Sequence, residues 1–90
     1  MFLLLSTVSK LISIAPDDAW NRENMLILYH NHKPESFKAK MEFASVLEEL
    51  EGVDGTIVNC NEFREHCQRN RIYHLPELVY VRDSYRHRYN

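Results

Sequence analysis

Two cysteines, Cys60 and Cys67, have the clearest capacity for chemistry in this chain. On one continuous helix, seven residues would separate them by ~10 Å along the axis, which is too far for a disulfide. If Cys60 instead ends a strand and a helix begins a few residues later, the chain can fold back and close the bond. The spacing therefore leaves open a disulfide, two buried free thiols, or a catalytic or metal-binding pair.

Histidines near these cysteines raise the possibility of a zinc site. His66 and His74 bring the number of potential ligands to four. The side chains of His66 and Cys67 would point about 100° apart on a helix, so both cannot readily reach one ion. We therefore expect the five histidines of the chain to be scattered surface residues, and we predict no metal and no cofactor.

Ser36 offers a different chemistry at the start of a predicted helix. Its hydroxyl would need a general base within hydrogen-bond reach, which His30, His32 or His74 would have to supply. We expect instead that Ser36 caps or covers the first helical turn, with Pro34 at a favourable early position. No catalytic residue is predicted.

The composition indicates one globular domain spanning residues 1–90, large enough for a modest core. A net charge of −2 provides no electrostatic reason to bind nucleic acid or an anionic membrane. The basic residues from 82 to 88 are explained as a solvated strand end. The apolar run within Met1–Ser6 is shorter than the ~7–15 residues of a signal peptide and the ~20 of a membrane span. We interpret it as a leading strand or the remainder of a trimmed segment.

Apolar patterns along the chain predict strands that alternate with helices. Strands are expected over residues 10–15, 25–30, 56–60, 78–81 and 85–89. Helices are expected over 18–22, capped by Asp17, over 36–51, ended by Gly52, and from a cap at Asn61 to about residue 70. Turns are expected at 53–55 and 82–84. Such an order indicates an α/β fold with parallel pairing and right-handed crossovers, closed by an antiparallel hairpin.

The long predicted helix is amphipathic. Its expected core arc comprises Ala39, Phe43, Val46, Leu47 and Leu50, widened by Phe37, Met41 and Ala44. Its expected solvated face comprises Lys38, Glu42, Ser45 and Glu49.

The order and spacing of these motifs resemble the thioredoxin family, and more narrowly the domains of protein disulfide isomerases. Residues 28–32 occupy the strand-to-turn stretch of that family, and Lys33-Pro34-Glu35-Ser36 stands where Cys-x-x-Cys is usual. Val58-Asn59-Cys60 and the later Cys67 match a strand-end cysteine and its partner. His74-Leu75-Pro76-Glu77-Leu78 matches the cis-proline segment. The resemblance covers about residues 10–90 and lacks the final helix of a complete thioredoxin domain.

This resemblance implies a thioredoxin-like α/β domain with a central mixed sheet flanked by helices and the final helix missing. It also implies a structural disulfide between Cys60 and Cys67 and a cis Leu75–Pro76 bond. The absence of a thiol at Lys33–Ser36 implies a domain without redox activity. The alternative is a thiol-disulfide oxidoreductase that works through Cys60 and Cys67.

Such redox-inactive domains serve as binding or structural modules of disulfide isomerase-like proteins. The resemblance implies a protein or peptide partner, or neighbouring domains of a longer chain, and no membrane insertion. It implies the endoplasmic reticulum lumen or secretory pathway, whereas free thiols would indicate the cytosol. The expected binding residues are Tyr29, His32, Lys33, Pro34, Glu35, Ser36, His74, Leu75 and Pro76.

The missing helix should leave part of one sheet face bare. We expect Val58 or Ile57, with alternate residues of 78–81, to be partly exposed on the face that the helix at 18–22 covers. Residues 2–5 could fold over this face, or two chains could pair, so we expect a dimer or a marginally stable monomer. The sequence also contains tyrosines that suggest an aromatic surface, although core packing is the default for Tyr29, Tyr73, Tyr80, Tyr85 and Tyr89.

Overall fold

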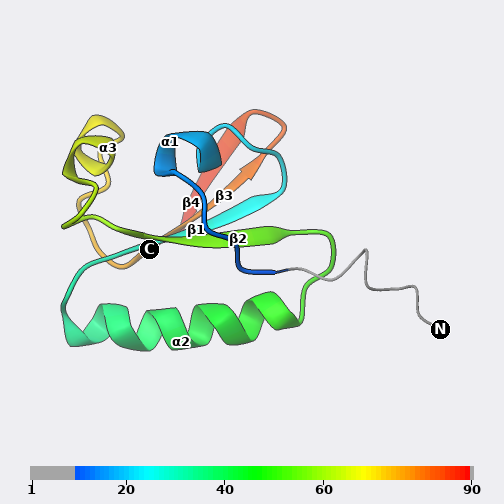
Figure 1. Ribbon diagram of the computed structural model, residues 1–90, viewed down its shortest axis with the longest axis horizontal. Coiled ribbons are helices and arrows are strands. Elements are labelled where there is room, and N and C mark those ends of the chain that lie inside the picture. The colour runs from blue at the N-terminus through cyan, green and yellow to red at the C-terminus, as the bar shows by residue number, and fades with distance from the viewer. Residues whose placement is uncertain (1–9, 90) are drawn as a thin grey trace.

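A computed structural model describes residues 10–89 of the chain (Figure 1). The expected leading strand within residues 1–6 lies outside this range. The described elements are α1 (Pro16–Ala19), β1 (Met25–His30), α2 (Pro34–Glu48), β2 (Asp54–Asn59), α3 (Arg64–Arg69), β3 (Glu77–Arg82) and β4 (Tyr85–Tyr89).

The strands form one mixed sheet in the order β2-β1-β3-β4. β1 and β2 are parallel and joined through α2, as the alternation of strand and helix predicted. β3 pairs antiparallel with both β1 and β4. The predicted α/β class, with a central mixed sheet flanked by helices, is confirmed for the described residues.

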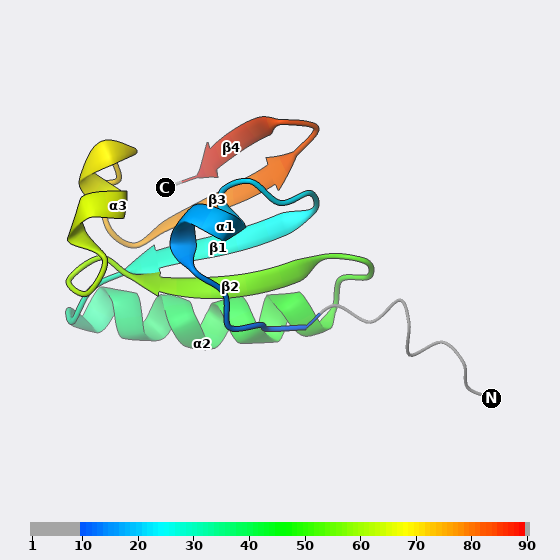
Figure 2. The same ribbon diagram turned by 45° about the horizontal axis from the view of Figure 1, so that its top comes forward.

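Helices cover the two faces of this sheet unequally. Figure 2 shows α1 and α3 on one side of the sheet and α2 on the other. The core under α1 and α3 contains Ala19, Met25, Ile27, Tyr29, Val58, Cys67, Ile72, Val79 and Val81. The smaller core under α2 contains Leu26, Leu28, Phe43 and Leu47.

The sequence-based expectation assigned the incomplete cover to the wrong face. Val58 and Val79 face α1 and α3 and are buried, whereas Ile57 and Leu78 pack toward α2 and are half-buried. β2 and β3 lie on opposite sides of β1, and the connection through α3 crosses on the face opposite α2. α2 packs mainly over β1 and β2, so the described residues only partly cover its side of β3 and β4.

The segment from 10 to 15 forms less of a strand than predicted. Leu11 makes an isolated parallel bridge to Gly55. The Ile12 N–H donates to the Gly55 carbonyl (2.8 Å), and the Gly55 N–H donates to the Lys10 carbonyl (2.9 Å). Beyond this bridge the chain turns away toward α1.

All three helix starts differ from the predicted ones, and α2 begins at Pro34, two residues before the expected start. α1 begins at Pro16, with Ala15 as its N-cap, so Asp17 is a helical residue and not the cap. Proline suits the first helical position because its missing N–H would have no partner there. α3 begins at Arg64, later than a cap at Asn61 would place it.

Gly55 was expected in a turn but lies within β2 directly beneath α2. A Cβ at this position would lie 2.7 Å from Leu47 Cδ2 and 3.0 Å from Phe43 Cζ. Glycine therefore permits the close approach of α2 to the sheet. The helix ends at Glu48, three residues before the predicted end, and Gly52 adopts a positive φ of 73° in the connection that follows.

The core stripe of α2 is narrower than the sequence predicted. Phe43 and Leu47 are buried, whereas Phe37, Met41 and Val46 are 64%, 63% and 53% exposed. One helix resting on a sheet buries only the side chains that point directly at it.

The predicted closing hairpin is confirmed. Asp83 and Ser84 have φ values of 53° and 67°, as a two-residue type I′ turn requires. Arg82 pairs with Tyr85 at its base, which sets the register of β4.

Candidate functional site

Two segments singled out from the sequence lie at the same end of the sheet. Tyr29, near the end of β1, pairs with Glu77 at the start of β3. The turn that leaves β1 and the loop that enters β3 therefore lie at the same end of the sheet. α2 begins at Pro34 after the first segment, and the second contains the Leu75–Pro76 bond. This bond is cis, as predicted.

Ser36 closes the turn into α2 and is fully buried. The Asn31 N–H donates to Ser36 Oγ (3.1 Å), and this hydroxyl donates to Asn31 Oδ1 (2.9 Å). The Lys33 N–H donates to the same Oδ1 (3.0 Å). Ser36 thus stabilises the first turn, as expected, and its hydroxyl is not presented to a substrate.

The predicted binding residues divide into two groups. Tyr29 and Ser36 have no exposed surface, so neither can contact a partner directly. Alternation along β1 points Tyr29 into the core, and Asn31 holds Ser36 inward. The turn and loop present His32, Lys33, Pro34, Glu35 and His74 as exposed residues, and Leu75 and Pro76 as half-buried ones.

The main chain of Leu75 has hydrogen-bonding capacity to spare. Within residues 10–89, neither its N–H nor its carbonyl makes a hydrogen bond. Free main-chain groups beside a proline can pair with an extended segment of another molecule. This end of the sheet could therefore bind a peptide backbone at Leu75, with exposed side chains of the turn before α2 close by.

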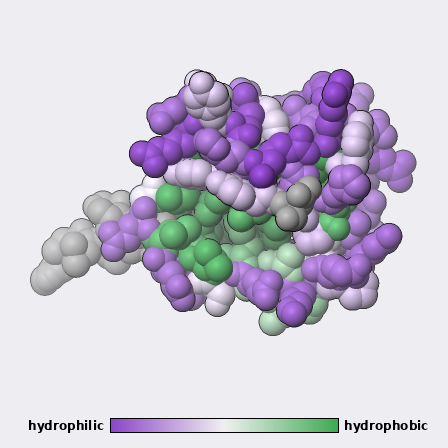
Figure 3. Space-filling view, turned by 180° about the vertical axis from the view of Figure 1, so that it is seen from behind, coloured by the Kyte–Doolittle hydropathy of each residue, from purple (hydrophilic) through white to green (hydrophobic). Residues whose placement is uncertain are grey.

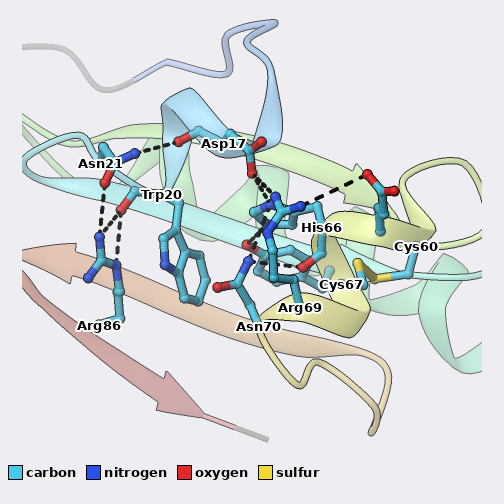
Figure 4. A network of polar contacts seen from close by, with 11 residues as sticks. Asp17, Trp20, Asn21, Cys60, His66, Cys67, Arg69, Asn70 and Arg86 are labelled. Atoms are coloured by element: carbon cyan, nitrogen blue, oxygen red, sulfur yellow. Dashed lines mark hydrogen bonds and ion pairs between the residues drawn. A yellow bond between two sulfur atoms is a disulfide. The ribbon is translucent and has the colours of Figure 1, made fainter.

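A polar network links α1 and α3 on the face of the sheet opposite α2. Figure 4 shows His66 of α3 beside Asp17 of α1, with Trp20 close to the same imidazole. His66 Nδ1 lies 2.8 Å from Asp17 Oδ1, and His66 Nε2 lies 2.8 Å from the hydroxyl of Tyr29. Since a carboxylate only accepts, Nδ1–H of His66 donates to Asp17. Arg69 also donates to Asp17 (2.7 Å).

The pKa values at the two ends of this network shift in opposite directions. The hydrogen bond from His66 lowers the pKa of Asp17 below its ordinary value, and Arg69 adds to the effect. Burial raises the pKa of Tyr29 well above its ordinary value, and the nearby Glu77 carboxylate adds to the rise. The Asp-His-Tyr arrangement resembles a proton relay, but Tyr29 is inaccessible to a substrate. The three side chains together hold α1 and α3 over β1.

Glu77 and Arg88 form a second polar contact beside the cis-proline. Glu77 is 1% exposed, and Arg88 Nε and Nη2 donate to its two carboxylate oxygens. Arg88 also donates to the carbonyls of Asn70 (3.3 Å) and Arg71 (2.7 Å). The arginine thereby links the entry to β3 with the segment that leaves α3. Bonding to Glu77 raises the pKa of Arg88 further above its ordinary value.

Cys60 and Cys67 form a disulfide, as the resemblance implied. Their Cα atoms lie 5.8 Å apart, because Cys60 directly follows β2 and α3 begins four residues later. Among residues 10–89, no three histidine, cysteine, aspartate or glutamate side chains are arranged to hold a metal ion. His66, weighed as a zinc ligand and expected at the surface, is instead buried in the network with Asp17.

Sequence reasoning missed both polar contacts. Asp17 was assigned to a cap, and Glu77 and Arg88 were read as parts of a strand entry and a solvated end. The one available signal was an acidic residue inside an apolar strand, since a buried charge requires a partner.

Comparison with known proteins identified no matching family and no matching curated protein. Within residues 10–89, no helix is long and apolar enough to cross a membrane.

Proposed function

We propose that this chain is a thioredoxin-like domain without redox activity, which binds an extended protein or peptide segment. The carrying observation is the unpaired main chain of Leu75 before β3, at the same end of the sheet as the N-terminus of α2. The mixed sheet flanked by helices, with β1 and β2 parallel and a closing antiparallel hairpin, supports the thioredoxin-like assignment because the resemblance implied these features.

The proposed binding mode is main-chain pairing. The N–H and carbonyl of Leu75 would bond to the backbone of a partner in an extended conformation. His74 and Lys33, both exposed, would contact its side chains. No covalent capture is involved, since Lys33–Ser36 contains no thiol.

The same turn accounts for the proposed lack of redox activity. A helix N-terminus activates a cysteine by favouring its thiolate, and α2 begins without one. Cys67 lies inside α3 and is 3% exposed, a poor position for attack by an external thiol.

We further propose that the domain acts in the secretory pathway, within a disulfide isomerase-like protein or beside its neighbouring domains. Disulfides persist in oxidising compartments, and the Cys60–Cys67 bond is consistent with one. The proposal includes no nucleic-acid partner and no membrane insertion.

A peptide-binding experiment tests the function. Extended apolar peptides would be titrated into the whole chain while the fluorescence of its single tryptophan and NMR shifts are followed. We expect shifts centred on Leu75 and binding weakened about tenfold in H74A and K33A. H87A and K10A are matched controls, because both residues are exposed, His87 lies on β4 and Lys10 lies beside Gly55 at the other end of the sheet. Binding that the controls weaken equally would contradict the proposed site.

A reductase assay separates the proposal from the oxidoreductase alternative. We expect no disulfide reduction or isomerisation above background. Turnover that disappears in C60S or C67S would overturn the proposal and favour catalysis by that pair.

A further inference from the structure

The side of β4 that faces α2 is an exposed aromatic surface. Residues that pair directly across two strands share a face, so Tyr85, His87 and Tyr89 lie on the same side as Tyr80. Tyr85 and Tyr89 are 70% and 54% exposed. The alternate residues of β4, Arg86 and Arg88, project to the other face.

Those arginines are already engaged within the chain. Arg86 donates to the Trp20 carbonyl (2.8 Å), and Arg88 bonds to Glu77. The polar residues of β4 therefore complete the α1 and α3 side, while its aromatic residues remain without a covering element among residues 10–89.

An apolar hollow lies between this aromatic strand and α2. It measures about 290 Å³ and is lined by Leu26, Leu50, Val53, Tyr80 and Tyr89. Figure 3 shows hydrophobic residues gathered on this side of the molecule, between polar rims. A bare apolar hollow of this kind usually marks an interface.

The two rims of the hollow carry opposite charge. Glu42 and Val46 of α2 and Glu49, its C-cap, follow one another at helical spacing. This row leads to Leu50, which lines the hollow, and forms the rim on that side. Neither glutamate makes an ion pair within residues 10–89. On the strand side, Arg82 lies on the same sheet face as Tyr80 and Tyr85 and is exposed, and its ion-pair partner is the adjacent Asp83 at 3.7 Å.

We propose that a second copy of this chain covers the hollow in a two-fold symmetric dimer. A two-fold axis through the hollow exchanges the rims, so the acidic rim of one copy meets Arg82 of the other. The aromatic residues of each β4 then pack against the hollow and Val46 of the partner. The charge arrangement favours this occupant, because the surface is complementary to itself.

The test measures the oligomeric state of the whole chain by sedimentation equilibrium, from about 1 µM to about 200 µM. We expect a monomer–dimer equilibrium that V46E and Y89E weaken at least tenfold. M41E is the matched control, because this exposed apolar residue, 63% exposed against 53% for Val46, lies on a different stripe of α2. A monomer throughout the range would overturn the proposal, as would an equal effect of M41E.

Charge reversal tests the pairing of the rims. E42K/E49K and R82E should each weaken the dimer about tenfold, since like charges would then face each other. The combination of all three changes should restore most of the affinity, because opposite charges meet again. A combined variant that dimerises no better than its parents would overturn the two-fold arrangement. The changed residues are exposed, and circular dichroism melts would verify folding. The proposed peptide-binding site at Leu75 lies outside the dimer surface. The dimerisation tests and the peptide-binding experiment can therefore fail independently of each other.

Discussion

Removing the positive partner of Glu77 should be among the most damaging single changes in this domain. In R88M, the Glu77 carboxylate would remain 1% exposed without its two donors. Breaking a buried ion pair in this way costs about 3–5 kcal/mol. Arg88 itself is 39% exposed, so water can partly replace it, and we expect the lower end, about 3 kcal/mol. For a domain of this size, that loss lowers the melting temperature by roughly 12–24 °C.

Urea denaturation of the oxidised protein, followed by the fluorescence of Trp20, measures this loss. R64M is the matched control, since Arg64 is exposed, lies outside the proposed dimer surface and makes no ion pair within residues 10–89. The double variant E77L/R88M should recover most of the stability, because an apolar pair removes the buried charge. The reasoning fails if R88M is as stable as R64M, or if the double variant is no better than R88M.

Three further results are expected. G55A should lose about 1–3 kcal/mol in the same denaturation assay, because its Cβ would lie 2.7 Å from an α2 side chain. C67S should lose ~2–3 kcal/mol, as expected for a loop of this length, and reduction of the wild type should raise its mass by about two hydrogens. D17N should be less stable than D18N at neutral pH, and the difference should vanish in acid. Folding lowers the pKa of Asp17, so the stability that its carboxylate contributes is fully present above the ordinary pKa of 3.8. This contribution is lost as the pH falls through the lowered pKa of the folded state. A difference between D17N and D18N that does not change with pH would refute this reasoning.

The elements of this fold with a strong local signal were predictable from the sequence. β1 is a continuous apolar run, and the structure buries all six of its residues. α2 follows from helical periodicity, and the closing hairpin follows from its turn residues. Ends of elements were less predictable, because Gly55 reads as a turn residue until α2 is packed against it.

Short motifs in the sequence also indicated the Lys33–Ser36 turn, and the family resemblance that they carry implied the cis-proline and the disulfide between Cys60 and Cys67. Only the tertiary structure decided which of these residues reach the surface and which charges meet. Asp17 and His66 are 49 residues apart in the chain, and Glu77 meets Arg88 through the register of β3 and β4. Local patterns determine local conformation, whereas the partner of a buried polar group depends on how distant elements pack.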